Sequence, residues 1–191
     1  MRPLLCACVA LLLATTAATA AAPRPEALVL GRADLPDGYK LGDDTVCGSL
    51  GVEGYPERMA QIILAHRPRA CFIQLENLRN GRYIESDAIL FASPQGAVEM
   101  YADRRELLEH EMGITKASVR TQRGIGEEAR LYLTSDAPAL GVTRPGAVVF
   151  WRRGVVVAGL LVAGPSRRTC KRVALRLARK QDARIRRALG S

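Results

Sequence analysis

The sequence contains few of the residues on which most enzymes depend. It has two histidines, His66 and His110, and a single tryptophan, and aromatic residues make up only 5% of the chain. No group of His and Cys residues has the spacing of a zinc site, and no glycine-rich phosphate-binding loop is present. The sequence therefore gives no positive support for a metal, a cofactor or an enzymatic activity.

Two short motifs match catalytic patterns only in part. Ser49 lies in the stretch CGSLG, but a nucleophile elbow needs glycine two residues before the serine, and position 47 is cysteine. Glu127 and Glu128 are adjacent, and adjacent side chains of an extended chain point to opposite faces, so they do not converge as glycosidase carboxylates do. An exported hydrolase of unrecognised type is the alternative to a non-enzymatic function.

The longest stretch without charge is at the N-terminus. An apolar run over residues 4–13 follows Arg2, and Ala18-Thr19-Ala20 supplies the small residues that signal peptidase accepts. We predict a signal peptide over residues 1–20, cleaved after Ala20, and a secreted or extracytoplasmic mature protein. An uncleaved anchor is the alternative, because residues 4–22 are nearly as long as a membrane span. The later run GVVVAGLLVAG is too short to cross a bilayer, so no transmembrane segment is expected in the mature chain.

Cysteine is scarce in the mature chain, which keeps Cys47, Cys71 and Cys170. Cysteines outside the cytoplasm tend to pair. We predict a disulfide between Cys47 and Cys71, which closes a loop of about 25 residues and stabilises the fold by roughly 3.5 kcal/mol in the chain-entropy model. Cys170 is then expected to be a buried free thiol that packs as a small apolar residue.

The patterning of the remaining chain predicts an α+β fold. Residues 21–54 are rich in loops, and residues 56–66 have the spacing of a short helix. Strand-like runs over 71–78 and 83–91 flank Asn80-Gly81, a strong hairpin signal, and Ser93-Pro94 begins a helix that ends near Gly113. Further strands are expected over 117–122, around Leu131, over 146–151 and over 155–163. We predict one domain over 55–189, with helices on a mostly antiparallel sheet of about five to six strands.

The C-terminal segment holds almost all of the excess positive charge. Residues 166–187 contain ten Lys and Arg residues and one acid, Asp182, while the formal net charge of the whole chain is +9. Apolar and small residues recur there at helical spacing, which predicts an amphipathic helix over 166–189 that packs on the sheet. Seven basic residues are expected on its outer face: Lys171, Arg172, Arg176, Arg179, Lys180, Arg186 and Arg187.

Three functions of this basic face can be compared. Nucleic acid is a poor partner, because the segment has no aromatic residue to stack on bases. Insertion into a membrane is disfavoured, because the apolar side is mostly Ala, Val and Cys rather than bulky residues. Anionic polymers of the cell envelope or lipid head groups are the expected partners, held by long-range attraction. A purely structural envelope protein is the other non-enzymatic interpretation.

Several segments resemble a known group of proteins. In chain order, ADLPDGY, GIGEEARLY, VVFWRRGVVVAGLLV and VALRLARKQDARI resemble secreted actinobacterial proteins of unassigned role. More distantly, they are similar to extracytoplasmic sensor-type domains and lipoproteins with a PsbP-like α/β/α sandwich. The resemblance implies a fold and a compartment, and it implies no catalytic residues. Members of the group often have Gly-Asp-Glu where this chain has Gly126-Glu127-Glu128, and they often carry two disulfides.

Overall fold

The computed structural model describes residues 22–35, 37–42, 45–77, 81–111, 119–135 and 144–190. The predicted signal peptide, Asn80 of the predicted hairpin turn and the predicted helix end at Gly113 lie outside these residues. The elements are η1 (Pro25–Ala27), η2 (Arg32–Asp34), β1 (Lys40–Leu41), β2 (Val46–Ser49), α1 (Glu57–His66), β3 (Arg69–Asn77), β4 (Arg82–Leu90), α2 (Pro94–Glu106), η3 (Leu107–Glu111), β5 (Val119–Thr121), β6 (Glu128–Thr134), β7 (Gly146–Arg153), β8 (Val156–Ala163) and α3 (Arg167–Leu189).

The strands form one antiparallel sheet in the order β1-β3-β4-β8-β7-β6-β5, with β2 also paired to β3. This confirms the α+β class and an antiparallel sheet. The sheet has eight described strands instead of five to six, because β1 and β2 form within the segment expected to be loops. Both are short and lie at the sheet edge, where Leu41 is 58% and Val46 68% exposed, so they lack the buried alternation that identifies a strand in sequence.

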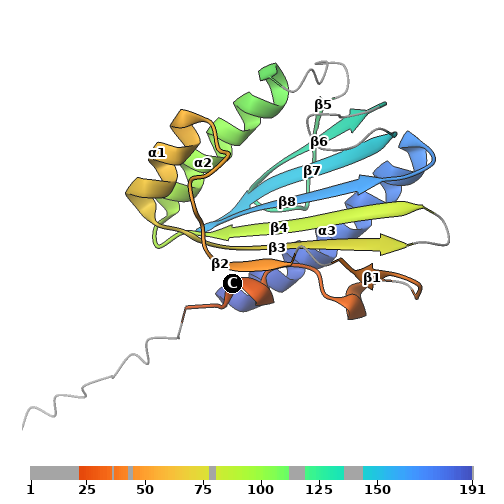
Figure 1. Cartoon of the computed structure of the whole chain (residues 1–191), viewed down its shortest axis with the longest axis horizontal. Helices are drawn as coiled ribbons and strands as arrows, with labels where there is room; N and C mark the ends of the chain where they lie inside the picture. The colour runs from red at the N-terminus through yellow and green to blue at the C-terminus, as the bar shows by residue number, and fades with distance from the viewer. Residues whose placement is uncertain are drawn as a thin grey trace, which may run out of the picture.

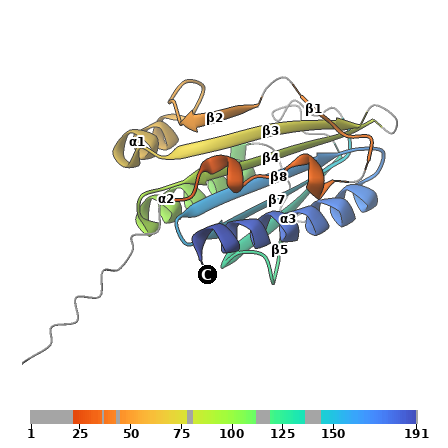
Figure 2. The same ribbon diagram turned by 90° about the horizontal axis from the view of Figure 1, so that it is seen from below.

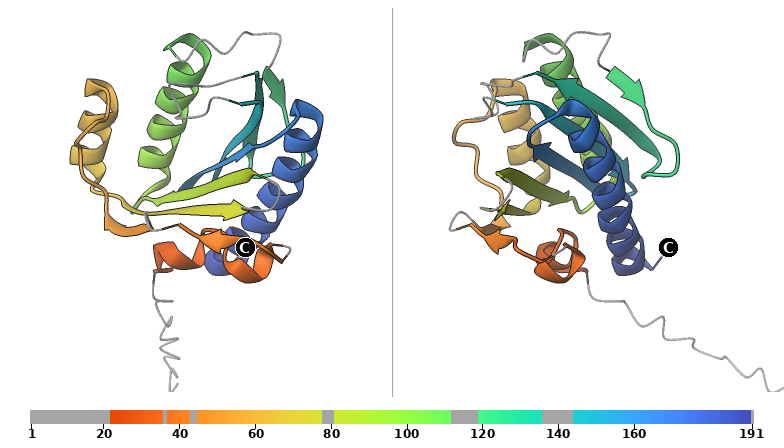
Figure 3. Two further views of the ribbon diagram at one scale, coloured as in Figure 1. Left: turned by 45° about the vertical axis from the view of Figure 1, so that its right-hand side comes forward. Right: turned by 90° about the vertical axis from the view of Figure 1, so that its right-hand side faces the viewer.

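Helices cover both faces of the sheet, which gives three layers (Figures 1 and 3). On one face, α1 and α2 bury Met59, Ile63, Met100 and Tyr101 against side chains of β4, β6, β7 and β8. On the other face, α3 and the N-terminal segment cover a second and larger apolar cluster. The paired strands β7 and β8 are buried almost throughout because they lie between these two layers.

The predicted basic helix packs on the sheet as α3 (Figure 2). Ser166 begins it as the N-cap, with its hydroxyl accepting a hydrogen bond from the Thr169 amide, and Gly190 ends it in the left-handed conformation. The side chains on its buried face are mostly apolar, several of them are small, and they pack against β7 and β8. The buried residues of the helix are Cys170, Val173, Ala174, Leu177, Ala178, Gln181, Asp182 and Ile185. Small side chains allow close approach to the sheet, so the helix is part of the core.

Polar contacts tie the N-terminal segment to α3. The Arg184 guanidinium pairs with Asp34 at 2.9 Å, and Lys180 Nζ donates to the Asp34 carbonyl at 2.8 Å. In the interior, the Ser86 hydroxyl donates to Gln181 Oε1 at 2.9 Å and accepts from the amide of Leu30 at 3.2 Å. These contacts satisfy buried polar groups and hold β4, α3 and the N-terminal segment together.

Candidate functional site

A cleft lies between α1 and α2 above strands β3 and β4 (Figure 1 shows the two helices on this face). Its volume is about 310 Å³, at the low end of the roughly 300–1,000 Å³ that ligand sites occupy. The walls are mostly apolar, and four side chains with titratable groups are among them. The lining residues are Leu50, Gly54, Tyr55, Pro56, Met59, Ala70, Cys71, Phe72, Glu85, Asp87, Ile89, Arg104 and Leu107.

The strand alternation of β4 places two carboxylates on the floor of this cleft. Side chains of successive strand residues point to opposite faces, so Glu85 and Asp87 share the face toward α1 and α2 while Ser86 faces α3. Asp87 is the register partner of Phe72 in β3 and of Gly159 in β8. The floor is therefore acidic at its centre and apolar around it.

Asp87 is neutralised by Arg104 of α2. The guanidinium Nη1 donates to Asp87 Oδ2 at 2.8 Å, and the guanidinium carbon lies 4.8 Å from the centroid of the Phe150 ring. Burial lowers the pKa of Arg104, but the charge and hydrogen bonds of Asp87 outweigh burial and raise it overall. Gly159 makes room for the pair, because a Cβ there would collide with Asp87 Oδ1. In the sequence, Arg104 only interrupts the apolar stripe of α2.

Glu85 has no such counter-ion. Its Oε2 accepts a hydrogen bond from the Tyr83 hydroxyl at 3.0 Å, and among the described residues it forms no ion pair. Burial raises the pKa of Glu85 above its ordinary value, and the nearby charge of Asp87 raises it further. The hydrogen bond from Tyr83 and the charge of Arg104 lower this pKa, but burial and Asp87 outweigh them. Partial burial also raises the pKa of Tyr55, which lies on the loop before α1. The cleft therefore holds one carboxylate whose ionised form is poorly stabilised by the protein itself.

Side-chain contacts join α1 to α2 beside the cleft. Arg58 of α1 pairs with Asp103 at 3.2 Å and with Glu106 at 3.4 Å, both on α2. At the other end of α1, His66 Nε2 lies 3.0 Å from Glu99 Oε2. These contacts connect the two helices near both ends of α1, in addition to their apolar packing on the sheet.

The predicted disulfide joins β2 to β3 on the face of the sheet that α3 and the N-terminal segment cover. Cys47 and Cys71 are register partners in β2 and β3, and their sulfurs are bonded. Cys71 also lines the cleft. Cys170 is a free thiol buried in α3, its Sγ lies 3.4 Å from the Pro145 carbonyl, and burial raises its pKa.

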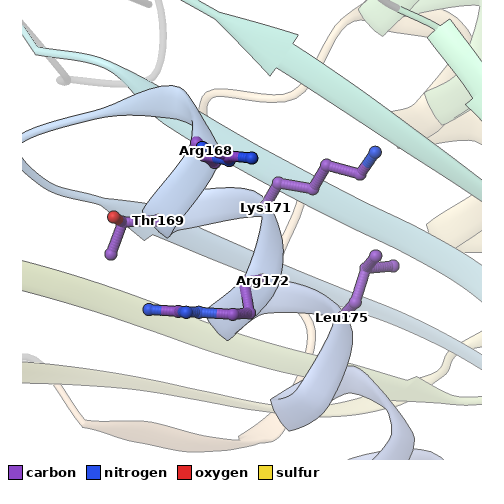
Figure 4. A pocket seen from close by; sticks show the side chains of 5 residues that line it. All are labelled: Arg168, Thr169, Lys171, Arg172 and Leu175. Carbon is purple, nitrogen blue, oxygen red and sulfur yellow. The ribbon is translucent and has the colours of Figure 1, made fainter.

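The seven basic residues predicted on the outer face of α3 are separate from the cleft. Arg172, Arg176, Arg179, Lys180, Arg186 and Arg187 are exposed, and Lys171 is half-buried. A shallow hollow of about 390 Å³ at the start of the helix is lined by Arg168, Thr169, Lys171, Arg172 and Leu175. Lys171 and Arg172 extend to opposite sides of the helix (Figure 4), so these side chains form a charged surface instead of converging on one small anion.

In the described part of the chain, Ser49, His66 and His110 make no hydrogen bond or ion pair with one another. His66 contacts Glu99, His110 is exposed, and Ser49 lies at the end of β2 opposite Arg69. Glu127 and Glu128 both pair with Arg152, at 2.7 and 3.2 Å, so the two carboxylates meet at one guanidinium instead of pointing to opposite faces, because Glu127 lies before strand β6. Across the described ranges no group of three or more His, Cys, Asp or Glu side chains could hold a metal ion. No helix in these ranges is both long and apolar enough to cross a membrane.

Comparisons with known proteins give one structural neighbour. A scan against models of protein families finds no match, and a search of curated proteins also finds none. Among solved structures, the fold is similar to the extracellular domain of PknH from Mycobacterium tuberculosis. The similarity has a TM-score of 0.48 and 8% sequence identity, and it covers 83% of this chain and 94% of that chain.

Proposed function

We propose that this protein is an exported, non-enzymatic binding domain that holds a small ligand in the cleft between α1 and α2. The observation that carries the proposal is Glu85, an unpaired and poorly solvated carboxylate inside an apolar cleft beside the Asp87–Arg104 pair. A few polar groups among apolar walls, with a perturbed pKa, are typical of binding sites. The Cys47–Cys71 disulfide and the apolar N-terminal sequence support an oxidising compartment outside the cytoplasm.

The alternative of an exported hydrolase has less support from the same face. Hydrolysis by a serine or cysteine nucleophile needs a base within hydrogen-bonding reach of that nucleophile. Glu99 is the hydrogen-bonding partner of His66, and the thiol of Cys71 is bonded to Cys47. Binding therefore accounts for the cleft better than catalysis does.

The test is a ligand screen that compares the mature protein with a variant in which a larger side chain fills the cleft. Small fragments are screened by amide NMR against the mature protein, the variant Ala70→Phe and the control Ala33→Phe. Ala70 lines the cleft floor, whereas Ala33 is exposed in η2. We expect fragments to shift the signals of β3, β4 and the end of α2, and Ala70→Phe but not Ala33→Phe to abolish these shifts. Fragments that bind elsewhere, or equally to Ala70→Phe, would contradict the proposal.

We also propose that the basic outer face of α3 associates with anionic polymers of the cell envelope or lipid head groups. Arg172, Arg176 and Arg179 are exposed along one helix and form no ion pair within the described part of the chain. Several cations on one surface attract an anionic partner at long range, and salt weakens this attraction. The charge is therefore available to a partner without disturbing the packed side of the helix.

The test compares two triple variants with the same change in net charge. One replaces Arg172, Arg176 and Arg179 by Gln, and the control replaces the exposed Arg32, Arg69 and Arg120 by Gln. Dextran sulfate and vesicles that contain phosphatidylglycerol are the two probes. We expect salt-sensitive binding that is lost in the first variant and retained in the control. Equal losses in both would show that only net charge matters, and no binding by the wild-type protein would refute the proposal.

A further inference from the structure

The charged side chains of the cleft differ in whether they form an ion pair. Among the described residues, three charged side chains line it: Glu85, Asp87 and Arg104. Arg104 donates to both oxygens of Asp87, at 2.8 and 3.5 Å, and its planar group lies over Phe150. Because that cation is already paired, an incoming anion would find no free cation and would meet the charge of Glu85. The cleft is thus unfavourable to anionic ligands.

Glu85 retains capacity to bind a donor. A carboxylate has about four acceptor positions, and among the described residues Glu85 accepts one hydrogen bond, from the Tyr83 hydroxyl. The titratable groups that act on it are Tyr83 and Asp87 of β4 and Arg104 of α2, and Tyr55 of the loop before α1 lines the same cleft. Its register partners on the two neighbouring strands, Gln74 and Leu161, carry no charge. An ammonium group is a donor with the charge that this position lacks.

The surroundings of Glu85 favour a cation over a neutral donor. Burial in apolar surroundings makes the ionised carboxylate unfavourable, which raises the pKa of Glu85. A bound cation offsets this cost, because opposite charges in a partly desolvated site attract more strongly than in water. A neutral hydroxyl supplies a hydrogen bond without the charge, and its gain is smaller.

The walls define the rest of the ligand. Met59, Phe72, Ile89 and Leu107 present apolar surface around the carboxylate. Such walls remove apolar ligand surface from water, which is favourable by about 25 cal/mol per Å². A volume of about 310 Å³ restricts the body to a small apolar group.

We propose, resting on the cleft being a ligand site, that its ligands carry a protonated amine on a small apolar body, and that Glu85 binds the ammonium while the walls hold the body. Asp87 and Arg104 are positioning residues in this arrangement, because Arg104, the one cation among the described lining residues, donates its hydrogen bonds to Asp87 and forms no ion pair with Glu85. The class of ligand is organic ammonium compounds, as opposed to carboxylates or neutral alcohols of the same size.

The experiment uses three probes that share one apolar body. Phenethylamine, phenethyl alcohol and phenylacetate are titrated by amide NMR at neutral pH into the mature protein, Glu85→Gln and Glu76→Gln. Glu76 is the matched control, since it is exposed on the same face of the sheet and does not line the cleft. We expect phenethylamine to bind most tightly of the three probes. Glu85→Gln should raise the Kd of phenethylamine about tenfold or more, whereas Glu76→Gln should leave it within about twofold of the wild-type value.

The outcomes separate this proposal from the proposed function. Binding of phenylacetate or the alcohol in the cleft as tightly as the amine would overturn the ammonium class while leaving the cleft a ligand site. If none of the three probes shifts the cleft signals of a protein that the spectrum shows to be folded, the ammonium class is overturned as well. The fragment screen then tests independently whether the cleft binds any ligand. Equal weakening of the amine by Glu76→Gln would show a nonspecific charge effect and would also overturn it.

Discussion

Asp182 of α3 accepts two hydrogen bonds from Arg153 of β7, from Nε to Oδ1 and from Nη2 to Oδ2, both at 2.7 Å. The Asp182 side chain is 9% exposed, and it is the one acid in the basic segment 166–187. The hydrogen bonds from Arg153 to Asp182 raise the pKa of Arg153. This planar, two-point pair fixes the helix against the β7–β8 hairpin.

Loss of this pair should destabilise the fold. We expect Asp182→Ala to lower the free energy of unfolding by about 2 kcal/mol, because it removes charge-assisted hydrogen bonds from a largely buried site. Urea denaturation measures the change, and a cycle with Arg153→Met isolates the pairwise part. If the two single variants were additive, the pair would contribute nothing specific.

Removal of α3 should abolish cooperative folding. The helix covers β7 and β8 with Val173, Leu177 and Ile185, so a protein that stops at Gly164 would expose a large apolar face of the sheet to water. We expect the truncated protein to lose its cooperative thermal transition and its near-UV circular dichroism. Melting identical to that of the mature protein would mean that the helix is an appendage.

Glu85 should make stability depend on pH in a defined direction. Its pKa is higher in the folded protein than its ordinary value of 4.5, so the folded state holds this proton more tightly than the unfolded chain. The side chain therefore lowers stability above its folded-state pKa, and this penalty disappears as the pH falls to the unfolded value. We expect Glu85→Gln to raise Tm at neutral pH, and the difference to vanish as the pH falls toward 4.5.

The control for this pH series is Glu76→Gln, which changes the same charge at an exposed position of the same face. Its Tm difference from wild type should vary little over the same pH range, since exposed charges interact weakly. A Glu85→Gln protein that is less stable than wild type at neutral pH would contradict the unpaired state of this carboxylate.

The disulfide should contribute measurably to stability. The bond closes a loop with a sequence separation of 24 residues, and the double variant Cys47→Ala/Cys71→Ala should lose about 3.5 kcal/mol, because the unfolded chain gains freedom. Chemical denaturation with and without a reductant checks this. The reductant should lower the stability of the wild-type protein and leave the double variant unchanged, and an equal response of both proteins would argue against the prediction.

Much of the fold follows from local sequence signals. The alternation in β3 and β4 predicted their hairpin, the Ser93-Pro94 pair predicted the start of α2, and the spacing of small residues predicted the packed side of α3. These features are local because they reflect strand and helix periodicity and the chemistry of helix ends. β1 and β2 were missed, because short edge strands leave half of their side chains and backbone groups to solvent.

The cleft was not predicted, although its residues carry a weak signal. Glu85 and Asp87 alternate with buried residues, which is also the pattern of an ordinary solvated face, and Arg104 interrupts an apolar helix stripe. A basic residue within such a stripe indicates a buried acidic partner, but periodicity does not identify which acid it is. That choice depends on the pairing of β4 with β8, where Gly159 leaves room for Asp87, and on the path of α2 across the sheet.

The sequence by itself determined the helices and most strands, the basic character of α3 and the two cysteines with a short loop between them, because each depends on residues near one another in the chain. Only the tertiary structure decided that Arg104 pairs with Asp87 and that Glu85 forms no ion pair with any described residue. Strand register and helix placement set distances between side chains that are far apart in sequence, and electrostatic energies in a cleft depend on those distances and on burial.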